Sequence, residues 1–176
     1  YAGDPGFARR WRAAADRLRA NFTRRFWNPK TRRLADRIQA DNRRDEKVRP
    51  NQLMVLSIPM IEPLLDEEQA DQVVANAVSE LLFPHGIASL SPRDPWFHPV
   101  HHNDACHHFD AAYHHGTVWV WSAGFTVTAL CQRRQTGLAA RLAGHLARQI
   151  LDLGCRGSMS ELIEAIPRRR GQLVLS

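Results

Sequence analysis

The chain has 176 residues, of which 44% are hydrophobic, enough to bury the core of one domain or of part of one. The net charge of +6 comes mainly from arginines dispersed through helical patterns, which indicates solvated helix faces and argues against nucleic-acid binding. No apolar run approaches the roughly 20 residues that span a bilayer, so no membrane association is expected.

The first part of the chain is predicted to contain two helices of different character. From Phe7 to Phe26, apolar residues recur at steps of three or four, which is typical of an amphipathic helix, and Asn28-Pro29 ends the pattern. Residues Lys30 to Val48 are polar around a short apolar island, Leu34 to Ile38. A second helix is predicted from Asn51 to Ile61, and its nearly all-round apolar character makes it an inner helix.

Three further helices are predicted. Acidic residues at Asp66-Glu67-Glu68 mark the first turn of one that Pro84 ends. A long His-rich and Pro-rich loop follows from Pro84 to Gly116, and loops of that length inside compact domains are usually functional. Val118 to Leu130 then reads as a second inner helix, and Leu138 to Leu153 as an outer amphipathic one.

Inner helices that alternate with outer amphipathic helices describe αα-hairpins stacked in two layers. No persuasive strand alternation is present in the sequence. The expected fold class is therefore all-α, and the architecture is expected to be toroidal.

The cysteines favour a reducing compartment. Cys106, Cys131 and Cys155 are odd in number, widely spaced and free of any Cys-x-x-Cys pair, so neither a disulfide framework nor a thiolate zinc site is indicated. The N-terminus carries no signal-peptide pattern. These features predict a cytoplasmic protein.

Four ordered blocks carry a family resemblance that covers nearly the whole chain. They are Arg49–Gln52 with Ser57–Pro59, Phe83–Ser91, Asp110–Trp119 and Gly157–Glu161. In order and spacing they resemble the C-terminal domain of bacterial amylo-alpha-1,6-glucosidases, glycogen-debranching-type enzymes of the six-hairpin glycosidase superfamily. The resemblance implies hydrolysis of α-1,6-linked glucose in a branched α-glucan or maltooligosaccharide, without a cofactor.

The resemblance also implies that residues 1–176 are about half of a toroid of six helical hairpins. Family members carry a Trp-rich segment with the catalytic acid upstream and a Gln-Ala-Trp-Ser helix downstream, and the chain contains neither. Tyr1 in place of an initiator Met fits a chain that starts inside a longer protein. We therefore expect a C-terminal portion truncated at both ends, lacking the N-terminal half of its own domain and inactive alone.

Glu161 matches the general base of the family. Hydrolysis of a glycosidic bond needs one acid to protonate the leaving oxygen and one carboxylate to activate water or attack directly. The resemblance implies an inverting reaction with Glu161 as the base. From the residues alone, Ser158-x-x-Glu161 can also be read as a helix capping box.

The remaining candidate residues would bind substrate through rings, amides and a carboxylate: Asn51, Gln52, Asp110, Tyr113, His114 and Trp119. Asn51 and Gln52 could instead cap the inner helices, Asp110 could form a loop Asx-turn, and Trp119 could be core, as expected for Trp121. Many relatives have Arg before this Asp, whereas this chain has Phe109, which bears on the orientation of Asp110.

Three other functions remain open. The His-rich loop holds enough ligands for a zinc ion, although no metal-binding spacing is present: His98, His101, His102, Asp104, Cys106, His107 and His108. A related toroidal glycosidase could act on another sugar. A catalytically silent carbohydrate-binding or interaction module would share the fold without the reaction.

Overall fold

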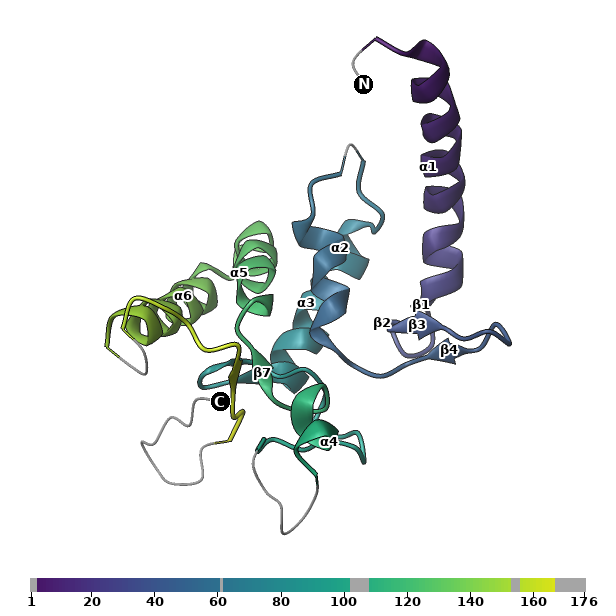
Figure 1. The fold of residues 1–176 in the computed structure, drawn as a ribbon. Coiled ribbons are helices and arrows are strands. Elements are labelled where there is room, and N and C mark those ends of the chain that lie inside the picture. The colour runs from purple at the N-terminus through teal and green to yellow at the C-terminus, as the bar shows by residue number, and fades with distance from the viewer. Residues whose placement is uncertain (1–2, 61, 102–107, 153–155, 167–176) are drawn as a thin grey trace.

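The computed structural model describes residues 3–60, 62–101, 108–152 and 156–166, which form a mostly helical fold (Figure 1). The helices are α1 (Pro5–Phe26), the 3-10 helix η1 (Pro50–Leu53), α2 (Met54–Ser57), α3 (Glu67–Leu81), α4 (Phe109–Tyr113), α5 (Ser122–Gln132) and α6 (Thr136–Leu151). The strands are β1 (Trp27–Asn28), β2 (Arg33–Leu34), β3 (Arg37–Ile38), β4 (Arg44–Asp45), β5 (Leu82–Phe83), β6 (Gly86–Ile87), β7 (Val118–Trp119) and β8 (Leu162–Ile163).

The predicted helical fold class is confirmed, and three helices match their sequence signals. Helix α1 begins after Asp4, whose carboxylate accepts hydrogen bonds from the amides of Gly6 and Phe7. Helix α3 begins with a capping box, in which Asp66 and Gln69 satisfy each other's backbone amides. Helix α6 lies where the outer amphipathic helix was predicted. None of the described helices has the length and apolarity to cross a membrane.

The predicted inner helix from Asn51 to Ile61 is wrong in length. Its described part consists of η1 and α2 and ends at Ser57, while Ile61 lies outside the described residues. Pro59 cannot donate to a helical carbonyl and disfavours helical geometry in the residue before it, and Ile58 is accordingly extended with ψ 123°. The apolar side chains of Ile58 and Met60, which directly follow α2, are exposed instead of internal.

The other inner helix starts later than predicted, and the expectation of no strands is also corrected. Helix α5 begins at Ser122 because Val118 and Trp119 pair with β8. The described strands form antiparallel pairs of two residues each, β1 with β2, β3 with β4, β5 with β6 and β7 with β8. Segments this short cannot show the period-2 alternation that identifies a strand in a sequence.

The main core lies between α3, η1 and the α5–α6 hairpin. Val73, Ala77 and Leu81 on α3 are buried against Leu53 of η1 and Leu130 of α5. Helix α1 lies apart and projects away from the other helices (Figure 1). Its C-terminal end packs against the core through the partly buried Phe22 and Phe26, whereas Trp11 and Leu18 on it are 57% and 62% exposed.

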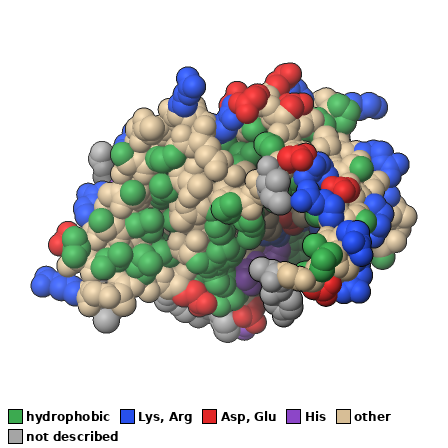
Figure 2. Space-filling model, turned by 90° about the horizontal axis from the view of Figure 1, so that it is seen from above, with side chains coloured by type: hydrophobic (Ala, Val, Ile, Leu, Met, Phe, Trp, Pro, Cys, Tyr) green, Lys and Arg blue, Asp and Glu red, His purple; other side chains and the backbone are tan. Residues whose placement is uncertain are grey.

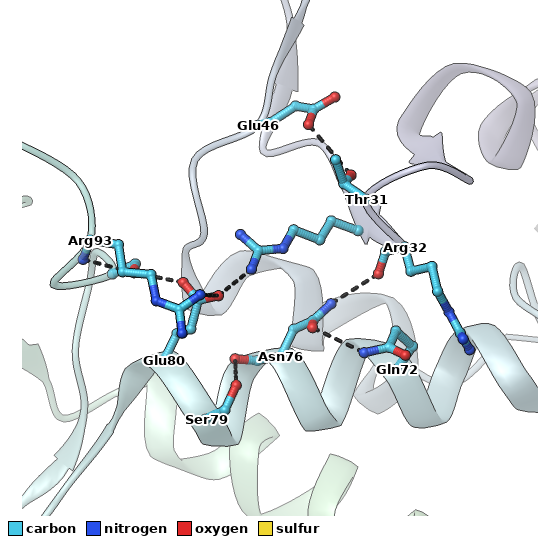
Figure 3. Close-up of polar contacts among 10 residues, drawn as sticks. Thr31, Arg32, Glu46, Gln72, Asn76, Ser79, Glu80 and Arg93 are labelled. Carbon is cyan, nitrogen blue, oxygen red and sulfur yellow. Dashed lines mark hydrogen bonds and ion pairs between the residues drawn. The ribbon is translucent and has the colours of Figure 1, made fainter.

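A buried carboxylate joins α3 to two distant segments. Glu80 is 5% exposed, and its side chain pairs with Arg33 of β2, with Arg93 at 3.5 Å and with the hydroxyl of Ser91 at 2.7 Å. One turn earlier, Asn76 donates to the carbonyl of Arg32 (Figure 3). A buried charge persists only when it is paired and hydrogen-bonded, so this network fixes the β1–β2 ribbon and the loop after β6 against α3.

Replacing Glu80 with Ala is expected to destabilise the fold by about 2–3 kcal/mol, because Arg33 and the Ser91 hydroxyl lose their buried partner. Urea unfolding followed by circular dichroism measures this loss. Arg93→Ala is the matched control: its side chain is 75% exposed, and we expect about 0.5 kcal/mol. Equal losses in the two variants would contradict the structural role of Glu80.

Candidate functional site

The pairing of β7 with β8 brings two distant blocks of the sequence together. Val118 pairs with Ile163 and Trp119 with Leu162, which places Glu161, just before β8, beside the end of α4. The Tyr113 hydroxyl donates a hydrogen bond to Glu161 Oε2 at 3.2 Å. The capping-box reading of Glu161 is wrong, because the described residues 156–166 contain no helix.

Three rings form a packed cluster next to this carboxylate. The rings of His114 and Trp119 stack with an interplanar angle of 1° and centroids 4.8 Å apart. The Tyr113 ring packs edge-on against both rings, and its centroid lies 4.8 Å from that of His114 and 4.8 Å from that of Trp119. Trp119 Nε1 also donates to the carbonyl of Tyr113 at 2.7 Å, so its orientation is fixed by a hydrogen bond as well as by packing. The structure thus groups three of the predicted substrate-binding residues with the predicted base.

The turn between α4 and β7 depends on Gly116. Its φ of +147° is rarely adopted by residues with a side chain, and a Cβ at this position would lie 2.5 Å from the carbonyl oxygen of His98. The close approach is part of the local structure, because the amide of His98 donates to the carbonyl of His115 at 2.6 Å. Gly116 therefore lets the His-rich loop pack directly against the ring cluster.

Arg49 holds the backbone beneath the cluster. Its Nη1 donates to the carbonyl of His114 at 2.5 Å and to that of Ser89 at 3.0 Å, while its Nε lies 3.5 Å from Asp36 Oδ2. Arg49 is thus a structural ion-pair partner of Asp36. Asn51 joins the same network by donating to Asp36 Oδ1 at 3.0 Å.

Gln52 follows Asn51 in η1, and Asp110 lies in α4, three residues before Tyr113. Gln52 is half-buried, and its Nε2 is buried without a hydrogen-bond partner among the described residues. Asp110 lies in the first turn of α4, so the loop Asx-turn reading is wrong. Its carboxylate is exposed and lies 3.5 Å from His108 Nδ1, leaving it accessible to a hydroxyl-bearing ligand.

An open groove adjoins the ring cluster and was not predicted from the sequence. It has a volume of about 640 Å³ and is lined by Asp36, Arg37, Asp45, Asn51, Trp96 and His114, among others. Figure 2 shows histidine side chains in a hollow of the surface between an apolar area and an area of charged side chains. The sequence signal for Trp96 was only a tryptophan in a Pro-rich loop, which does not by itself indicate a site.

Two other expectations from the sequence have different outcomes. Trp121 was expected in the core, yet it is 55% exposed, because it precedes α5 and contacts Trp119 and Phe125 with ring edges. Of the candidate zinc ligands, His102, Asp104, Cys106 and His107 lie outside the described residues. Within the described part, no three His, Cys, Asp or Glu side chains are grouped to hold a metal ion.

The site offers an exposed carboxylate beside a phenol that stays neutral. Desolvation, the hydrogen bond to Glu161 and the charges of Glu161 and Asp110 all raise the pKa of Tyr113 above its usual value. The phenol therefore remains a hydrogen-bond donor at neutral pH and orients one carboxylate oxygen. The second oxygen is available to bind and deprotonate a water molecule.

The sequence matches a known protein family. A family model described as amylo-alpha-1,6-glucosidase matches residues 6–172. A search of curated proteins returned no match.

We expect Gly116→Ala to destabilise the chain by about 2–4 kcal/mol, since the new methyl group collides with the His98 carbonyl and the backbone is strained. The control is Gly144→Ala in α6, where a Cβ meets no atom within 4 Å. That change should stabilise by about 0.5–1 kcal/mol through helix propensity. Thermal unfolding of both variants measures these changes in stability. If Gly116→Ala left the stability unchanged, the close approach of Gly116 to the His98 backbone would be contradicted.

Tyr113 should ionise at higher pH than free tyrosine, and Glu161→Gln should bring its pKa back toward 10.0 by removing the negative charge. The raised pKa stabilises the folded state below the pKa of the unfolded chain, and this contribution disappears as pH rises through the folded-state pKa. The ionisation of Tyr113 is followed by the ultraviolet absorbance of tyrosinate. A Tyr1→Phe background removes the other tyrosine of the chain. If Tyr113 ionised at the same pH in the Glu161→Gln variant as in the protein that retains Glu161, the contact between Tyr113 and Glu161 would be excluded.

Proposed function

The chain belongs to the amylo-alpha-1,6-glucosidase family, and from this membership we propose that it forms part of the catalytic domain of a glycogen-debranching glycosidase. The reaction is hydrolysis of α-1,6-linked glucose at branch points of glycogen-like glucans. The observation that carries the proposal is the contact between Tyr113 and the exposed carboxylate of Glu161 beside stacked aromatic rings.

Glu161 acts as the general base of an inverting reaction. It takes a proton from water as the water oxygen attacks the anomeric carbon, and the glycosidic bond breaks as a separate acid protonates the leaving oxygen. Inverting glycosidases hold the two carboxyl groups about 6.5–9.5 Å apart to make room for that water. We propose that the acid is supplied by a part of the catalytic domain outside residues 1–176.

Tyr113 positions the base. Its hydroxyl donates to Glu161 Oε2 at 3.2 Å, which fixes the carboxylate plane and leaves Oε1 to hold the water. The phenol ring in turn packs edge-on against the stacked rings of His114 and Trp119. An oriented base costs less reorganisation when the water attacks, because its geometry is set before the reaction.

The substrate is an α-glucan or a maltooligosaccharide. Rings with polar edges, such as Trp119 and His114, match a pyranose, which has apolar C–H faces and a belt of hydroxyls. Asp110 and Asn51 supply exposed polar groups near the cluster that can bind sugar hydroxyls. We further propose that residues 1–176 are the C-terminal portion of the six-hairpin catalytic domain.

Glu161→Gln in the full-length protein is expected to lower kcat by about 10²–10⁴-fold, because the amide cannot accept the proton from water. Tyr113→Phe should lower kcat by about tenfold with little change in KM, because it loosens the base without removing it. Release of glucose from a branched dextrin is the assay, and Glu68→Gln, on an exposed surface of α3, is the control.

Proton nuclear magnetic resonance of the first product separates the mechanisms, since inversion at an α-linkage releases β-glucose before mutarotation. Unchanged turnover in Glu161→Gln would refute the base assignment. An inactive wild-type full-length protein that still binds glucan would favour the silent carbohydrate-binding module. Hydrolysis of a different sugar in preference to branched dextrin would favour a related toroidal glycosidase.

A further inference from the structure

We propose that the groove beside the ring cluster is a second sugar subsite, in which Trp96 is the platform for a further glucosyl unit of the α-glucan. The inference rests on the proposed function and adds a specificity determinant to it. The subsite would make the enzyme prefer chains of contiguous glucosyl units over a single glucose.

Trp96 presents a large apolar surface on a fixed backbone. Its side chain is 62% exposed in a loop otherwise held by hydrogen bonds: its amide donates to Asp94 Oδ1 at 2.9 Å, and the amide of Phe97 donates to the Asp94 carbonyl at 3.0 Å. Pro95 further limits the backbone between them. An exposed indole on a rigid turn binds the C–H face of a pyranose at low entropic cost.

The groove is also lined by charged side chains that form ion pairs with one another. Asp45 of β4 is 6% exposed and accepts from Arg37 Nε at 3.0 Å, with Lys47 Nζ at 3.4 Å. Asp36 pairs with Arg49 and accepts from Asn51. Each charged side chain of the groove is thus already engaged in an ion pair, so the groove suits a neutral ligand with many hydroxyls better than an ion.

His115 adds an acceptor to the groove. Its Nδ1 lies 3.1 Å from the carbonyl oxygen of Ala111, which can only accept, so Nδ1 carries the proton. Desolvation and the neighbouring charge of Arg49 lower the pKa of His115, so the ring is neutral at pH 7. Its Nε2 therefore has a free lone pair for a sugar hydroxyl.

The groove is continuous with the candidate active site through His114. One residue serves both: His114 stacks on Trp119 in the ring cluster and also lines the groove with Trp96. The volume of about 640 Å³ lies within the range of roughly 300–1,000 Å³ that is usual for small-ligand sites. A glucan chain bound at the ring cluster can thus extend over the indole of Trp96.

The test is isothermal titration of the full-length protein with maltotetraose and with methyl α-glucoside. Trp96→Ala should weaken maltotetraose binding about tenfold and leave methyl α-glucoside binding unchanged, while Trp96→Phe should retain most of the affinity. Trp11→Ala is the matched control, because Trp11 is 57% exposed on α1 and does not line the groove.

Each outcome separates this inference from the proposed function. If wild type binds both sugars and Trp96→Ala binds them as tightly as wild type, or weakens both equally, the subsite is refuted while the proposed function stands. An equal loss in Trp11→Ala would likewise refute it, because the effect would then not belong to the groove. If the wild-type protein binds neither sugar, both the subsite and the proposed function fail.

Discussion

The antiparallel contact of Val118 and Trp119 with Leu162 and Ile163 is the constraint on which the candidate site depends. Val118, Leu162 and Ile163 are each at most 2% exposed, so the backbone groups of this ladder have no access to solvent and must pair with each other. The bridge between Ala88 and Val118 extends the ladder to β6. Three segments far apart in the sequence are thereby brought together, and Glu161 reaches Tyr113 only as a consequence.

Close packing around this ladder requires the absence of side chains at two positions. A Cβ at Gly86 would lie 2.5 Å from Val118 Cγ1, and one at Gly116 would collide with the His98 backbone. Both residues have positive φ values, so their glycine identity serves conformation as well as space. The backbone at Gly86 can then approach Val118, and the backbone at Gly116 can approach His98.

Two charged side chains fasten the rest of that loop to the N-terminal half of the described chain. Glu80 accepts from Ser91, and Arg49 donates to the carbonyls of Ser89 and His114. Charge-assisted hydrogen bonds of this kind are stronger than neutral ones, particularly where water is excluded. The segment that carries the candidate substrate contacts is therefore rigid where it meets α3 and η1, and its exposed parts, such as Trp96 and Asp110, remain available to a ligand.

The sequence by itself determined the helical class and the positions of α1, α3 and α6, because apolar periodicity and capping residues are local signals. It also singled out Tyr113, His114, Trp119 and Glu161, through motifs of residues close in the chain. Only the tertiary structure decided that Glu161 precedes a strand, since the partner of β8 lies more than forty residues earlier.

The Trp96 groove was likewise decided by the tertiary structure. Its lining residues come from β3, β4, η1 and several separate loops, and no local pattern in the chain connects them. Long-range pairing and the shape of a cavity depend on which segments meet in space, and that information is spread over the whole chain.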